Sequence, residues 1–248
     1  MNAAIYAIIQ KDIRGITSNK RLFSTIIIVP LILTILLPSI FIFAIQFAPE
    51  ELDELQEVLK LLPSTEQTKE LDQMALSLIL NNIMPVFFLM IPIMTASIMA
   101  ASSFVGEKEK HTLETLFYCP LSLKQIFRAK VLASFLLSMM VSFFSFFAMM
   151  FVVEMELILI SGTWFFPNIS WLLILLLVAP SISLIAITLI VRGSAKAQSV
   201  EESQQGAVFL ILPIILLIVG QFTGVLLIST WILFVLGILC ALLAYILL

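Results

Sequence analysis

The chain has 248 residues, of which 61% are hydrophobic and only 12% are charged, and its mean hydropathy is +1.16. Soluble globular domains carry about 25% charged residues, so this composition excludes that class and indicates a polytopic membrane protein. A net charge of −3 does not suggest a nucleic-acid partner, and two distant cysteines with one histidine give neither a disulfide framework nor a metal-binding spacing.

Residues 1–21 are predicted to form an amphipathic helix that lies in the membrane interface. Isoleucines recur at near-helical spacing on one side of it, and polar or basic side chains face the other. A plain basic lead-in to the first span is the alternative. The segment has no small-residue cleavage site, so we expect no removable signal peptide. The isoleucines are Ile5, Ile9, Ile13 and Ile16, and the opposite side carries Gln10, Lys11 and Arg14.

Six apolar stretches are long enough to cross a hydrocarbon core, which takes about 20 helical residues. The sequence therefore predicts an all-α polytopic membrane protein with one permease domain over residues 1–248. The last 42 residues carry no charge and are long enough to cross a membrane twice, so the chain must fold back, and we expect the break at 220–224. The predicted spans are 22–47, 73–105, 131–153, 169–191, 203–222 and 226–248.

Several polar residues interrupt or end these apolar stretches. Asn81 and Asn82 lie in the second span, where asparagines usually join helices, with a contact to substrate as the alternative. Glu154 and Glu156 are expected to close the third span at the outer surface, before a loop over 157–168; a gate or an ion site is the alternative. Gln221 lies at the predicted fold-back. An external loop, 48–72, holds most of the other acids and a short helix.

Residues 106–130 lie between the second and third spans and contain five of the 13 basic residues. Thr112 can cap a short helix with Glu114 in its first turn, and Pro120 prevents its continuation. Ser122 with Gln125 forms a capping box for the next helix. From the residues alone, this segment is either a docking element or an ordinary loop whose charges fix the topology. The short helix presents one apolar face, made of Leu113, Leu116 and Phe117.

This segment, Gly-Glu-Lys-Glu followed by Thr-Leu-Glu-Thr-Leu and Pro-Leu-Ser, resembles the signature of type 2 ABC exporter permeases. The resemblance implies an elbow helix at 1–21 and a coupling helix that binds in a groove of an ABC ATPase. It also implies a second permease chain, identical or homologous, and ATP with magnesium in the partner ATPase. His111, where glycine is frequent, and Phe117, where leucine is usual, depart from the pattern. The residues implied in ATPase coupling are Gly106, Glu107, Glu109, Thr112, Leu113, Glu114, Leu116, Phe117 and Pro120.

Two features predict the same orientation, with both termini in the cytoplasm. The segments 1–21, 106–130 and 192–206 hold eleven of the 13 lysine and arginine residues, which is the bias typical of cytoplasmic loops. The tryptophans are predicted to form an aromatic belt at the outer edge, and the tyrosines one at the inner edge. They are Trp164, Trp171 and Trp231 outside, and Tyr6, Tyr118 and Tyr245 inside.

The chain contains no P-loop, no H-E-x-x-H and no G-x-S-x-G motif, so we expect no catalytic residues, no metal and no cofactor in it. The expected function is the permease subunit of an exporter in the cell membrane, and the spans do not select among drugs, peptides, lipids, polysaccharides and ions such as sodium. The alternatives are a membrane immunity or scaffold protein without transport, and an intramembrane enzyme. For an enzyme, only Glu154 and Glu156 approach the required pair of groups.

Overall fold

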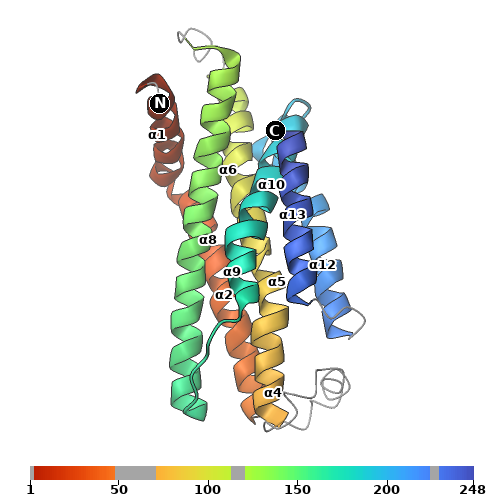
Figure 1. Cartoon of the computed structure of the whole chain (residues 1–248). Helices are drawn as coiled ribbons and strands as arrows, with labels where there is room; N and C mark the ends of the chain where they lie inside the picture. The colour runs from red at the N-terminus through yellow and green to blue at the C-terminus, as the bar shows by residue number, and fades with distance from the viewer. Residues whose placement is uncertain (1–2, 48–70, 113–120, 224–228) are drawn as a thin grey trace.

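The computed structural model describes residues 3–47, 71–112, 121–223 and 229–248, and within these ranges the chain is helical with no strand. The helices form one elongated bundle (Figure 1), and the predicted all-α class is confirmed. In chain order they are α1 (Ala3–Ser18), α2 (Lys20–Phe47), α4 (Leu71–Leu78), η2 (Ile79–Ile83), α5 (Met84–Phe88), α6 (Met90–Glu109), α8 (Leu123–Ser161), α9 (Ile169–Leu173), η3 (Ile174–Val178), α10 (Ala179–Ser194), α11 (Val200–Gln205), α12 (Val208–Phe222) and α13 (Thr230–Leu247).

Six helical stretches within the described residues are long and apolar enough to cross a membrane, as predicted. The charge-free end of the chain folds back after α12 ends at Phe222 and before α13 begins at Thr230. The short helix predicted in the external loop lies outside the described residues. The six stretches are Leu22–Phe47, Ala75–Glu109, Leu123–Ser161, Ile169–Ser194, Val200–Phe222 and Thr230–Leu247.

The helix of the third span extends well beyond the predicted 131–153. α8 is continuous over 39 residues and ends at Gly162, whose φ of 62° supplies a left-handed C-cap. At about 1.5 Å per residue α8 is about 58 Å long, nearly twice the hydrocarbon core. Glu154 and Glu156 therefore lie within the helix, and the loop expected from 157 begins at Gly162. Hydropathy marks the part of a helix that is in lipid, whereas capping residues decide where the helix ends.

Spans two and four each contain one π-helical turn that ends two residues before a proline. η2 precedes Pro85 and η3 precedes Pro180, and each proline is the second residue of the helix that follows. A proline donates no N–H and its ring crowds the carbonyl one turn earlier, so a wider turn relieves the clash. The freed carbonyls then need donors from other helices, because lipid offers none.

Trp171 is one such donor, and its position corrects the predicted aromatic belt. Its side chain is 1% exposed and packs between Phe88 and Phe146, with ring centroids 5.8 and 5.5 Å away. Its indole N–H donates to the carbonyl of Leu80 at 3.0 Å. Leu80 lies five residues before Pro85, which has no N–H to offer that carbonyl. The exposed tryptophans at this end of the bundle are Trp164 and Trp231.

In the core, α6 and α8 meet through small and hydroxyl-bearing side chains. The Ser138 hydroxyl lies 3.0 Å from the Thr95 hydroxyl and donates to the carbonyl of Pro92 at 3.0 Å. Such residues let two backbones approach closely and bond directly where no water is present. The other fully buried small residues of these two helices include Ala96, Ala100, Ala133, Ser134, Ser142 and Ser145.

α1 packs lengthwise on α8, and the interfacial position predicted for 1–21 stays a prediction. Ile8 and Ile9 lie in one cluster with Ile126 of α8, and further along α1 Ile16 lies in a cluster with Leu137. The apolar side of α1 is therefore covered by protein. Amphipathicity predicts that one side of a helix is buried, but it does not say whether lipid or a neighbouring helix covers that side.

The three segments predicted to be cytoplasmic lie at one end of the bundle. α1, the end of α6 with the start of α8, and α11 gather at the end where both chain termini lie (Figure 1). α1 packs on α8 and α11 packs on α6. The end of α2 and the start of α4 lie at the opposite end.

Candidate functional site

Buried charges meet where α6 ends and α8 begins. Lys130 of α8 is 2% exposed, and its ammonium lies 2.8 Å from a carboxylate oxygen of Glu107 on α6. The ammonium also donates to the backbone carbonyl of Ser103 at 2.6 Å and lies 5.4 Å from the centre of the Phe104 ring. Glu107, one of the residues implied in ATPase coupling, therefore points into the chain and joins the two helices that flank residues 113–120.

α1 contributes two residues to the same place. Asp12 is 8% exposed; its carboxylate lies 3.7 Å from the Lys130 ammonium and accepts a hydrogen bond of 2.6 Å from the Ser103 hydroxyl. Lys11, which is half-exposed, pairs with the second carboxylate oxygen of Glu107. We call Lys11, Asp12, Ser103, Glu107 and Lys130 the α1–α6–α8 cluster. All ion pairs among the described residues belong to it.

The cluster balances two buried carboxylates against two lysines, one of them deeply buried. An unpaired buried charge is costly because it has lost its hydration. Each charged member of the cluster therefore depends on its partners to offset that desolvation cost. The net stability of such a cluster is small, but removing one partner is expensive. We expect the cluster to fix the register in which α1, α6 and α8 meet, because any slip separates buried opposite charges.

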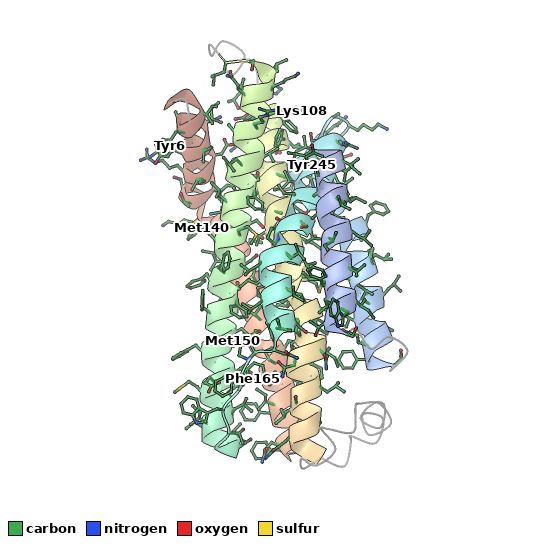
Figure 2. The ribbon with its side chains drawn as sticks, in the orientation of Figure 1. Tyr6, Lys108, Met140, Met150, Phe165 and Tyr245 are labelled. Carbon is green, nitrogen blue, oxygen red and sulfur yellow. The ribbon has the colours of Figure 1, made fainter. Side chains whose placement is uncertain are left out.

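The other side of the same α6 turn is bound to the segment before α11. Lys108 donates to the carbonyl of Ala197 at 2.8 Å, and the Glu109 carboxylate accepts the N–H of Val200 at 3.3 Å. Gly106 lies against Val200, since a Cβ added to it would be 3.6 Å from that side chain. Figure 2 labels Lys108 at this end of the bundle. The Gly106–Glu109 sequence is thus held on both sides within the chain.

The predicted start of α8 is confirmed. The Ser122 hydroxyl accepts the N–H of Gln125 at 3.3 Å, and the Gln125 side chain accepts the N–H of Ser122 at 3.0 Å. Thr112 is the last described residue before the segment 113–120, and its backbone N–H donates to the carbonyl of Glu107 at 2.9 Å. Five of the residues implied in ATPase coupling lie outside the part of the chain that the structure describes. They are Leu113, Glu114, Leu116, Phe117 and Pro120.

The match to a known family covers this cluster and the first five spans, and it ends near the start of α13. The family model described as ABC-2 family transporter protein matches residues 6–233, which is most of the chain. The chain belongs to the ABC-2 transporter family. No curated protein and no solved structure gives a significant match.

In this ABC-2 family member, the polar residues predicted near the opposite end join helices rather than gather at one point. The Asn81 side chain accepts the N–H of Asn168 at 3.0 Å. The carbonyl of Asn82, which lies in the π-helical turn, accepts a hydrogen bond of 3.0 Å from the Gln221 side chain on α12. These contacts attach the second span to the start of the fourth and to the fifth, through the side chain of Asn81 but only through the backbone of Asn82.

The two glutamates on α8 engage different elements. The Glu154 carboxylate accepts the N–H of Phe165 at 3.2 Å, which holds the 162–168 loop against the helix. The Glu156 carboxylate accepts the Ser39 hydroxyl of α2 at 2.6 Å. Residues two apart on a helix point to different sides, so this ABC-2 chain does not bring the two carboxylates together as an acid–base pair.

Sequence reasoning missed Asp12 and gave no separate role to Lys130, the last residue of the 106–130 segment. A signal for Asp12 was present, because it falls at helical spacing between Ile9 and Ile16, on the apolar side of α1. An acid at such a position needs a cation from another element. No pattern in the sequence, however, indicates that the cation comes from α8.

Proposed function

We propose that this ABC-2 family chain is the permease subunit of an exporter, which lines a transport path together with a second permease chain. A separate ABC ATPase would bind ATP and magnesium and supply the energy. Family membership and the six-helix layout support the transport role. The absence of a P-loop motif from the sequence supports an external source of ATP hydrolysis.

The observation that carries this proposal is that both helices flanking residues 113–120 are bound to one another. Glu107 and Lys130 form an ion pair at 2.8 Å, so a force on the segment moves α6 and α8 as one body. α8 then continues without a break to the opposite end, where Glu156 is bonded to Ser39 of α2. A coupling helix at 113–118, bound in an ATPase groove, would have a stiff lever about 58 Å long attached to it.

The proposed chain spans the cell membrane several times. Coupling to a cytoplasmic ATPase requires that the α1–α6–α8 cluster, α11 and both termini lie on the cytoplasmic side. The bias of eleven basic residues toward the segments at this end supports it.

We expect Leu113→Asp combined with Leu116→Asp to lower recovery of the ATPase with the affinity-purified chain by at least about thirtyfold. Apolar anchors of a helix in a groove are typical binding hot spots, worth about 2 kcal/mol or more. The measurement is co-purification from native membranes, with the ATPase identified by mass spectrometry. Lys110→Gln with His111→Asp lowers the charge of the segment by the same amount without touching the apolar side, and should retain the ATPase. Undiminished recovery with the leucine variant, found normally in the membrane, would contradict the coupling role.

Labelling of Cys119 tests the orientation. A maleimide that cannot cross membranes should label the chain in inside-out vesicles and leave it unlabelled in intact cells. Cys240, the second cysteine, lies within α13 and is shielded by lipid and protein, and a Cys119→Ser variant gives the background. Labelling in intact cells would place the segment outside and end the proposal.

A further inference from the structure

A hollow of about 1170 Å³ lies between α8 and α13, at the end of the bundle that holds the α1–α6–α8 cluster. α8 and α13 each pack against α10, which lies between them (Figure 1), so their ends leave a crevice whose floor includes Leu184 of α10 and Phe104 of α6. Its volume exceeds the roughly 300–1,000 Å³ of ordinary small-molecule pockets. Tyr245, labelled in Figure 2, lies on the α13 side of it.

The crevice changes character along α8. Its deeper part is apolar, lined by Val131 and Phe135, and its mouth carries Lys124 and Arg128, one turn apart. Positions 124, 128, 131 and 135 recur at helical spacing, so they form one stripe that is cationic in the first turns of α8 and apolar after them.

The two cations at the mouth have no protein partner among the described residues. Lys124 and Arg128 are exposed, and neither takes part in an ion pair there. No carboxylate side chain is among the residues that line the crevice, and the main-chain carboxylate of Leu248, which does line it, forms no ion pair with either cation. The start of α8 adds the positive end of its helix dipole to the same place. The mouth is therefore built to attract an anion.

Two spans end beside the crevice, so we expect it to lie at the boundary of the membrane. Arg192, at the end of span four, donates to the carbonyl of Leu247 at the end of span six at 3.0 Å, so both spans end beside the crevice. Lys124 and Arg128 then lie on the headgroup side of that boundary, and Phe135 on the hydrocarbon side.

We propose that this crevice binds an anionic phospholipid of the inner leaflet, with its phosphate at Lys124 and Arg128 and an acyl chain along Val131 and Phe135. A phospholipid is complementary to this stripe along its length. Its anionic headgroup would face the cations, and its apolar acyl chain would face the apolar side chains. Basic pockets between membrane helices on the cytoplasmic side typically bind such headgroups. The assignment of the leaflet rests on the orientation in the proposed function.

The test uses the full-length chain in nanodiscs that contain equal amounts of phosphatidylglycerol and phosphatidylcholine, with the retained lipids measured by native mass spectrometry. Phosphatidylglycerol should be retained in preference. Lys124→Gln with Arg128→Gln should lower the ratio of the two retained lipids by about five- to thirtyfold, since each cation near a membrane surface is worth about 1 kcal/mol. Lys124→Arg with Arg128→Lys should preserve the ratio. Val131→Trp, which fills the apolar part, should reduce retention of both lipids.

Lys20→Gln with Lys196→Gln is the matched control, because it removes the same charge from exposed residues outside the crevice, and it should leave the ratio unchanged. An unchanged ratio in the Lys124 and Arg128 variant would overturn the proposal. So would disulfide-linked dimers of a Leu132→Cys variant in membranes, because a second copy would then occupy the crevice.

Co-purification of the ATPase, measured on the same variants, separates this inference from the proposed function. An ATPase that co-purifies with a chain showing no preference for phosphatidylglycerol would overturn the lipid site alone. A preference that depends on Lys124 and Arg128 in a chain that recruits no ATPase would overturn the exporter proposal and leave the lipid site standing.

Discussion

Lys130→Met should lower the free energy of unfolding by about 3–5 kcal/mol, because the Asp12 carboxylate would remain buried without a cation and Glu107 would keep only the half-exposed Lys11. Methionine matches the length of the lysine stem, so the loss comes from charge rather than from a cavity. For a chain of this size the melting temperature should fall by roughly 6–20 °C. Thermal unfolding of the purified chain, followed by size-exclusion chromatography after heating, measures the shift.

A second substitution separates pairing from packing. Lys130→Met combined with Glu107→Gln removes one charge of each sign, so the double variant should be more stable than the sum of the single changes by about 0.5–3 kcal/mol. Lys196→Met, the same change at an exposed lysine, should leave the melting temperature unchanged. If Lys130→Met melts like the parent chain, the cluster does not hold α1, α6 and α8 together, and the lever loses its attachment.

Trp171→Ala should cost about 3–5 kcal/mol, the usual range for removing a fully buried tryptophan. The side chain is 1% exposed and fills the space between Phe88 and Phe146. Its loss also leaves the carbonyl of Leu80 without the donor that the proline-associated π-helical turn requires. The melting temperature should fall by roughly 6–20 °C in the same assay.

Trp171→Phe divides this effect between its causes. A phenyl ring keeps most of the packing but donates no hydrogen bond, so the remaining loss of about 1–3 kcal/mol reports the unsatisfied carbonyl. Trp231→Ala makes the same change at a position that is 78% exposed and should alter stability little. A Trp171→Ala chain as stable as the Trp231→Ala chain would show that span four does not depend on this contact.

Features that depend on neighbouring residues were predictable. The Ser122–Gln125 capping box formed as expected because both partners lie within one helical turn. The fold-back after α12 followed from the length of the charge-free stretch alone. The ends of α8 were not predictable from hydropathy, since the helix continues through Glu154 and Glu156 to a glycine cap.

Features that depend on two distant helices were not predictable. The spacing of Asp12 marks it as buried, yet its partner Lys130 lies more than a hundred residues away, and only packing brings α1 onto α8. The predicted position of Trp171 in an outer belt was wrong for a related reason. A tryptophan near the end of a span suits either the lipid interface or a buried carbonyl, and the π-helical turn in span two decides between them.

By itself the sequence determined an all-α membrane chain with six spans and a basic end, because each apolar run must satisfy its own backbone hydrogen bonds in lipid and only a helix does so. The tertiary structure alone decided which polar groups meet: Lys130 with Glu107 and Asp12, Trp171 with Leu80, and Glu156 with Ser39. Those pairings depend on the rotation and register of one helix against another, which side chains far apart in the sequence fix jointly.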